Sequence, residues 1–163
     1  MNEDCLKLTS YFGERDRHGG RFLADELLDL YDRHSFRSSI LLRGVEGFGI
    51  KHRLQTQRLL TLSEDLPLVA VGIDTRERVE PVLREVRERF HEGLLTVERA
   101  RMLTGDVARV ELPADLQEAT KLTIYCGRNE RVRGRPAALE IVECLQRGGV
   151  AGATVFLGVD GTV

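Results

Sequence analysis

The stretch that decides the fold runs from Lys7 to Val45 and reads KLTSYFGERDRHGGRFLADELLDLYDRHSFRSSILLRGV. It recurs from Lys121 to Val159 as KLTIYCGRNERVRGRPAALEIVECLQRGGVAGATVFLGV, at a fixed offset of 114 residues. From Lys7 to Gly47 about 14 of 41 positions are identical without a gap, far above chance for one fixed offset. The repeat predicts one whole structural unit followed by the front part of a second, which stops at Val163 inside the position of a loop.

The hydrophobic periodicity inside and beyond this stretch predicts six elements of the first unit. Apolar residues alternate with polar ones along a strand and recur every three or four residues on one face of a helix. The expected elements are a strand over residues 5–12, a helix with Leu23, Leu27 and Leu30, strands over 36–43 and 66–73, a helix with Val79, Val82 and Val86, and a strand over 94–102. Thr75 is the expected N-cap of the second helix, and Pro81 would sit early in it.

This order of strand-helix-strand-strand-helix-strand predicts the ferredoxin-like split βαβ plan of the α+β class. An antiparallel sheet then carries two helices on one face and leaves its other face bare. Leu68, Val69, Ala70 and Val71 make the third strand apolar on both sides, so the bare face should be apolar as well. Association of several chains through the sheet would cover that face.

The repeat also sets the expected domain organisation. The bounds are 1–103 for a complete unit, 104–119 for a linker and 120–163 for a partial second unit that is one βαβ half. Its predicted elements are strands over residues 121–126 and 150–157 and a helix over 136–146.

The two strands of one βαβ half are not neighbours, because a strand of the other half lies between them. We hypothesise that two such half-units from different chains interleave and restore a four-stranded sheet. The plainer alternative is that the chain is truncated or clipped within the second copy, since long loops are sites of cleavage.

Composition and charge exclude several classes of protein. The 24 basic residues nearly cancel the 26 acidic ones, so the net charge of −2 argues against binding nucleic acid by phosphate neutralisation. No apolar run approaches the ~20 residues that span a bilayer, and the acidic start of the chain does not resemble a secretory signal. Cys5, Cys126 and Cys144 form no close pair, which is typical of a reducing compartment. We expect a cytoplasmic protein.

Two stretches are candidate binding sites. The connection from Gly44 to Asp65 is far longer than a hairpin needs and carries several cations, so it either docks on a partner, closes over an anion, or is a solvated loop. The other stretch places glycines and arginines just before a predicted helix N-terminus, where backbone amides favour an anion. Its candidate residues are Gly13, Arg15, Arg17, Gly20 and Arg21. Alternatively the glycines serve the turn and the arginines pair with Glu14, Asp16 and Asp25.

Local motifs for catalysis or metal binding are not found in the sequence. His18, His34, His52 and His91 lack metal-ligand spacing, and neither G-x-S-x-G nor H-E-x-x-H occurs. We therefore expect no catalytic residues, no metal and no enzymatic activity.

The strand end at Leu41 to Gly49, with Gly47-Phe48-Gly49, resembles the start of the long T-loop in PII signal-transduction proteins. The whole chain is more similar to a PII-like family known as domain of unknown function 190. The motifs that carry this resemblance are Lys7-Leu8-Thr9, residues 11–15, Gly20-Arg21 and residues 60–67. The resemblance implies a homotrimer whose sheets pack around a threefold axis. Interleaved half-units would then link trimers into higher oligomers such as hexamers.

The resemblance also implies a ligand and a mode of action. PII proteins bind adenine nucleotides in clefts between subunits, and their T-loop acts on a membrane transporter or an enzyme. The counterparts of the nucleotide-binding residues are Gly47, Phe48, Gly49, Lys51, Arg99 and Arg101. The glycine-rich phosphate loop of PII is replaced by the short turn His91-Glu92-Gly93, and the long loop has no tyrosine to modify. The expected function is thus a regulator that binds a small anion such as ATP, ADP or AMP. The alternatives are an interaction module without a ligand and, less in keeping with the motifs, an enzyme or a metal-binding protein similar to CutA.

Overall fold

The computed structural model describes residues 2–44, 46–48, 54–56, 66–91, 93–103 and 121–162. The chain forms two compact units. The first comprises Met1–Glu111 with Gly158–Thr162, and the second comprises Leu112–Leu157 with Val163.

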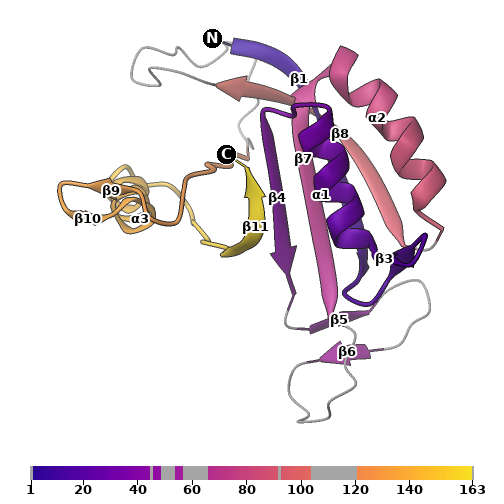
Figure 1. Cartoon of the computed structure of the whole chain (residues 1–163). Helices are drawn as coiled ribbons and strands as arrows, with labels where there is room; N and C mark the ends of the chain where they lie inside the picture. The colour runs from indigo at the N-terminus through magenta and orange to yellow at the C-terminus, as the bar shows by residue number, and fades with distance from the viewer. Residues whose placement is uncertain are drawn as a thin grey trace. The chain divides into compact units, whose positions relative to one another are not determined.

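The described residues of the first unit form one five-stranded antiparallel sheet, two helices and two small hairpins (Figure 1). In chain order its elements are β1 (Asn2–Gly13), β2 (Arg17–His18), β3 (Arg21–Phe22), α1 (Leu23–Arg33), β4 (Ser38–Arg43), β5 (Glu46–Phe48), β6 (Leu54–Thr56), β7 (Pro67–Thr75), α2 (Arg76–Arg89), β8 (Leu94–Leu103) and β11 (Gly158–Thr162). The strand order is β11-β4-β7-β1-β8. The four strands β4, β7, β1 and β8 have the order of a split βαβ unit, so the predicted ferredoxin-like fold is confirmed.

The registers show how the two βαβ halves interleave. Strand β1 pairs with β7 from Cys5↔Thr75 to Gly13↔Pro67, and on its other side it pairs with β8. Strand β4 also pairs with β7, so β7 lies between β1 and β4 and holds both of them. The first strands of the two halves, β1 and β7, are therefore central, and the second strands lie outside them.

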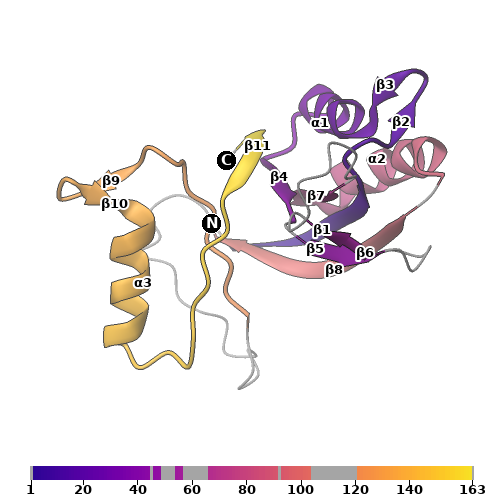
Figure 2. The same cartoon turned by 90° about the horizontal axis from the view of Figure 1, so that it is seen from below.

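The core lies between the sheet and the two helices, which share one face of the sheet (Figures 1 and 2). Side chains alternate along β1, so Leu6, Leu8 and Phe12 point to the helices. The apolar stripes of the two helices pack against them, as the sequence predicts. These stripes are Leu23, Leu27 and Leu30 on α1 and Val79, Val82 and Val86 on α2. Each buried side chain of this size contributes roughly 1.5–3 kcal/mol to folding.

None of the described helices of this unit covers the other face of the sheet. Its part on β7 and β4 is apolar, as expected: Val69 and the buried Val71 alternate with the core-facing residues of β7, and Ile40 and Leu42 lie beside them on β4. Towards β8 the same face carries the ion pair of Lys7 with Glu98. Further along the same face Tyr11 is exposed. We call this surface the open sheet face.

At the junction of β7 and α2, the N-cap is Thr75, as predicted, but its hydroxyl makes no capping hydrogen bond. The polar centre of the junction is instead Asp74, whose side chain is fully buried. Its carboxylate accepts hydrogen bonds from the backbone N–H groups of Arg37 at 2.9 Å and Thr75 at 2.7 Å. This carboxylate thereby ties the start of β4 to the start of α2.

The second unit contains a small hairpin, β9 (Arg131–Val132) with β10 (Arg135–Pro136), followed by α3 (Ala137–Arg147). The helix agrees with the predicted one to within a residue. The predicted strands over 121–126 and 150–157 are wrong as paired strands in this structure, because neither segment belongs to a ladder. By the repeat they correspond to β1 and β4, which in the first unit pair with β7 and not with each other.

Candidate functional site

The predicted residues Gly47 and Phe48 lie on β5, which pairs with β6 in a small hairpin. This hairpin follows Gly44, whose N–H donates to the carbonyl oxygen of Pro67 at the beginning of β7. It therefore belongs to the end of the sheet where β4 finishes and β7 begins (Figure 1). The other two predicted residues of this connection, Gly49 and Lys51, lie outside the described residues.

The two predicted phosphate contacts, Arg99 and Arg101, lie on β8 at the edge of the sheet and are exposed. Arg99 stands opposite Leu6 and Arg101 opposite Asp4, so both side chains project on the same side of the sheet as α1 and α2. The guanidinium Nε of Arg101 lies 3.4 Å from the Asp4 carboxylate, which is itself exposed.

These two groups of residues lie towards opposite ends of the sheet within one chain. The β5–β6 hairpin adjoins Pro67, which pairs with Gly13, whereas Arg99 pairs with Leu6. Seven strand residues separate Gly13 from Leu6, which is roughly 23 Å at 3.3 Å per residue. A single protomer thus does not bring the described residues Gly47 and Phe48 together with Arg99 and Arg101.

The glycine- and arginine-rich stretch before α1 forms the β2–β3 hairpin. Its turn is organised by Asp16, whose carboxylate accepts the N–H of Gly13 at 2.8 Å and whose carbonyl accepts the N–H of Leu23 at 2.8 Å. Arg17 donates to the carbonyl of Gly20 at 2.8 Å and lies over the ring of Phe22, 3.9 Å from its centroid. Such a contact holds the guanidinium by cation–π attraction.

Arg21 already has acidic partners in the same chain. Its guanidinium contacts Asp29 at 2.7 Å and Glu26 at 2.9 Å, and the hydrogen bond to Asp29 raises the pKa of Arg21. The pairing differs from the one that the sequence suggests, since Glu14 pairs with Arg43 of β4. The anion site over Gly13, Arg15, Arg17, Gly20 and Arg21 stays a prediction, with the charge of Arg21 balanced by α1.

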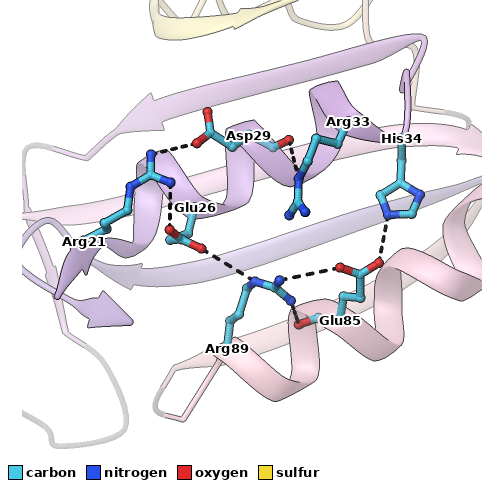
Figure 3. A network of polar contacts seen from close by, with 7 residues as sticks. All are labelled: Arg21, Glu26, Asp29, Arg33, His34, Glu85 and Arg89. Atoms are coloured by element: carbon cyan, nitrogen blue, oxygen red, sulfur yellow. Dashed lines mark hydrogen bonds and ion pairs between the residues drawn. The ribbon is translucent and has the colours of Figure 1, made fainter. Parts of the chain in front are cut away.

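A polar network that the sequence did not predict joins the two helices (Figure 3). Glu26 of α1 bridges Arg21 and Arg89, and Glu85 of α2 bridges Arg89 and His34. The closest of these contacts is 2.8 Å, between His34 Nε2 and Glu85. The four-residue spacing of Glu85 and Arg89 was visible in the sequence, but which faces of α1 and α2 meet was not.

A small surface hollow of about 170 Å³ lies where the β2–β3 hairpin meets the end of α2. Its lining residues are Asp16, Arg17, Leu23, Arg89 and His91. The rings of His18 and His91 lie close together there, with centroids 5.8 Å apart. The sequence gives no sign of this pairing, because the two histidines lie far apart in the chain.

The residues that the structure describes contain no group of three or more His, Cys, Asp or Glu side chains placed to hold a metal ion. Nor, in the same part of the chain, is any helix long and apolar enough to cross a membrane.

Residues 5–102 and 119–163 match the family described as "Uncharacterized ACR, COG1993", or DUF190. The chain belongs to the DUF190 family. Both copies of the internal repeat fall within the match, which confirms the family resemblance that the sequence motifs suggest.

Two relatives of the chain are UPF0166 proteins from Aquifex aeolicus (strain VF5). One is 32% identical over 66 residues, which span 40% of this chain and 69% of the relative. The other is 25% identical over 91 residues, which span 56% of this chain and 86% of the relative.

Among solved structures, the DUF190 chain is similar to CPII, a nitrogen regulatory PII-like protein from Thiomonas intermedia K12. A structure of CPII bound to ADP, AMP and bicarbonate has a TM-score of 0.49 and 19% identity, and covers 63% of this chain and 91% of CPII. The apo form of CPII has a TM-score of 0.42 and 16% identity, with coverage of 63% and 95%.

Proposed function

We propose that this protein is a PII-like regulator without enzymatic activity, which acts in the cytoplasm as a homotrimer. It binds a small anionic ligand, an adenine nucleotide first of all, in clefts between subunits. It then acts on a membrane transporter or an enzyme through the connection from Gly44 to Asp65. The observation that carries this proposal is the DUF190 fold with a largely apolar sheet face that none of the described helices covers.

The open sheet face supports the trimer. Strands β4, β7 and β1 present Leu42, Val69 and Tyr11 side by side on it, in matched register. A contiguous apolar surface of this kind marks an interaction site, since monomeric proteins rarely leave one exposed. Packing three such faces around one axis would bury the surface and create three equivalent boundaries between protomers.

The separation of the candidate ligand contacts supports a site between protomers. The β5–β6 hairpin carrying Gly47 and Phe48 lies at one end of the sheet, and Arg99 and Arg101 lie towards the other. We propose that the hairpin of one protomer faces the arginines of its neighbour, with Lys51 adding a third cation. Guanidinium groups suit phosphate because they donate two parallel hydrogen bonds.

The short turn between α2 and β8 favours the smaller nucleotides. Only residues 90–93 connect these elements, whereas backbone amides that wrap a polyphosphate need a longer glycine-rich loop. ADP and AMP are therefore the ligands to test before ATP, and CPII is named as bound to the same two.

Titration calorimetry of the full chain with AMP, ADP, ATP and cyclic nucleotides tests the ligand. We expect binding of ADP or AMP that weakens roughly 10-fold or more in Arg99→Ala, because a charged hydrogen bond contributes about 1.5–3 kcal/mol. Arg33→Ala, an exposed arginine on α1, is the matched control and should bind as the natural chain does.

Unchanged affinity in both Arg99→Ala and Lys51→Ala would remove these side chains from the site. If none of the nucleotides gives heat and none alters the protease sensitivity of residues 44–65, the ligand proposal fails. The second candidate function, an interaction module without a ligand, would then hold, since the open sheet face supports association by itself.

A further inference from the structure

The surface hollow between the β2–β3 hairpin and the end of α2 collects cationic side chains from two distant parts of the chain. Arg17 comes from the hairpin, whereas Arg89 and His91 come from the last turn of α2 and the turn after it. Among the described lining residues the one acid is Asp16, whose carboxylate accepts the N–H of Gly13. Two guanidinium groups against one carboxylate give this lining a net positive charge.

Arg17 is held in position by contacts that leave its charge uncompensated. It donates to the carbonyl oxygen of Gly20 at 2.8 Å, and its guanidinium lies over the ring of Phe22, 3.9 Å from the centroid. No carboxylate in the described part of the chain forms an ion pair with it. A cation that is already ordered costs a ligand little conformational entropy on binding, so Arg17 is prepared to meet an anion.

Arg89 has hydrogen-bond donors to spare, although its side chain is largely buried. Its Nη1 donates to the carbonyl oxygen of Glu85 at 2.8 Å. The carboxylates of Glu26 and Glu85 lie 3.7 Å from Nε and 3.5 Å from Nη2, longer than the about 2.7–2.9 Å of a charged hydrogen bond (Figure 3). Nε is buried and makes no hydrogen bond to any described residue. Since a guanidinium group carries five N–H donors, Arg89 can still serve an acceptor that enters the hollow.

The two helix ends beside the hollow leave the sign of its charge to these arginines. Leu23, the first residue of α1, brings the positive end of one helix dipole, and Arg89 lies near the negative end of the other. Each end is equivalent to about half a unit charge, so the two offset each other. The guanidinium groups also disfavour a metal cation at His18 and His91, although the centroids of these rings are only 5.8 Å apart.

We propose that the hollow binds a phosphate-sized oxyanion, either free phosphate or the phosphate group of a small ester. Its volume of about 170 Å³ is roughly half that of the smallest cavities that hold drug-sized ligands, so it accommodates a phosphate group but not a whole nucleotide. Arg17 and Arg89 donate to the phosphate oxygens, and His91 adds a third donor. Of the five residues of the anion site expected from the sequence, this site uses Arg17 alone. It lies within one protomer and does not depend on the nucleotide proposal.

Titration calorimetry of the full chain with inorganic phosphate, at an ionic strength held constant with sodium chloride, tests the proposal. We expect saturable binding of one phosphate per chain, which Arg17→Ala weakens roughly 10-fold or more because a charged hydrogen bond is lost. Arg87→Ala is the matched control, since Arg87 is exposed in the last turn of α2 and does not line the hollow. Glycerol phosphate is titrated in parallel. Saturable binding of either compound supports the site, and the tighter of the two identifies the source of the phosphate group.

Nuclear magnetic resonance locates the bound phosphate without any substitution. The ring signals of His18 and His91 should shift as phosphate is added, whereas those of His34, which follows the other end of α1, should stay in place. Heats that do not saturate, equal phosphate affinity in Arg17→Ala and Arg87→Ala, or unmoved signals of His18 and His91 would each overturn the proposal. None of these results depends on ADP or AMP, so failure here is distinct from failure of the proposed function.

Discussion

Two buried polar side chains of the first unit, Tyr31 and Asp74, allow specific predictions about the free energy of unfolding. The Tyr31 side chain is fully buried and its ring stacks on Phe36, with centroids 5.0 Å apart. Its hydroxyl has no hydrogen-bond partner in the described part of the chain. Burial raises the pKa of Tyr31 to about 12.

We therefore expect the ionisation of Tyr31 to lower the free energy of unfolding in alkali. The folded-state pKa lies above the unfolded value of about 10, so the stabilisation is complete below pH 10 and is lost as the pH rises towards 12. Urea unfolding should show the free energy of unfolding falling by about 1.4 kcal/mol from this group between pH 8 and pH 11.

The matched variant is Tyr31→Phe, which keeps the ring and removes the unpaired hydroxyl. It should unfold within about 1 kcal/mol of the natural chain at pH 8, because no hydrogen bond is lost. Its free energy of unfolding should fall less between pH 8 and pH 11. If the free energy of unfolding falls equally in the two proteins between pH 8 and pH 11, the pKa of Tyr31 is not raised in the folded state.

Asp74 gives the second prediction at this scale. Replacing it by alanine leaves two backbone N–H groups, those of Arg37 and Thr75, without their acceptor. We expect Asp74→Ala to lower the free energy of unfolding by roughly 3 kcal/mol, and Asp74→Asn by less, because an amide oxygen still accepts. Asp32→Ala, on the exposed side of α1, should cost less than about 0.5 kcal/mol. Similar costs for Asp74→Ala and Asp32→Ala would contradict this role.

At the scale of elements, the packing of α1 on α2 depends on the network around Arg89. That side chain is largely buried and contacts Glu26 of α1 and Glu85 of its own helix. We expect Arg89→Ala to lower the free energy of unfolding by roughly 1–2 kcal/mol, because Glu26 then keeps only Arg21 as a partner and Glu85 keeps only His34, and the link between the helices is lost. Denaturation by urea at low salt measures the change.

Helix α2 contains its own control for this substitution. Arg76 also pairs with a glutamate four residues on, Glu80, at 2.9 Å, but both side chains are more than half exposed. Arg76→Ala should therefore cost less than about 0.5 kcal/mol. If the two alanine variants lose the same stability, the network does not join the helices energetically.

The helices could be predicted from the sequence, whereas the pairing of some strands could not. The stripes on α1, α2 and α3 repeat every three or four residues, so all three helices were predictable from periodicity. The strand patterns of residues 121–126 and 150–157 predicted strands that the structure leaves unpaired. Periodicity reports which side of a segment is apolar, but a ladder needs a neighbouring strand, and that neighbour is not encoded locally.

At the scale of the whole molecule, the order of elements predicted the fold, while the proposed site depends on an assembly of protomers that the sequence does not describe. The positions of Gly47 and Arg99 in the sequence gave no sign that they lie towards opposite ends of one sheet. The repeat was readable because its motifs are identical at one fixed offset. Arg21 pairs with Asp29 and not with one of the acids that the sequence suggested, because several carboxylates lie about equally near Arg21 along the chain.

The open sheet face yields an assembly prediction. Val69→Arg should dissociate the proposed trimer, because it places a charge amid the apolar residues of β7 and β4. Its mass by sedimentation should fall about threefold while its circular dichroism is retained. Asp32→Arg, on the exposed side of α1, should leave the mass unchanged. An unaltered mass in Val69→Arg would place the trimer contact elsewhere.

The most direct test of the central claim, a ligand site shared between two protomers, is a mixing experiment read by calorimetric stoichiometry. Lys51→Ala and the double variant Arg99→Ala, Arg101→Ala are each expected to bind ADP poorly as pure trimers. Trimers reassembled from an equal mixture should recover about one quarter of the natural number of sites. A site is intact only where one protomer keeps Lys51 and its neighbour keeps Arg99 and Arg101, and each of these conditions is met at about half of the boundaries. A mixture that recovers no sites at all would contradict the account, because the residues would then serve a site within one chain or no site.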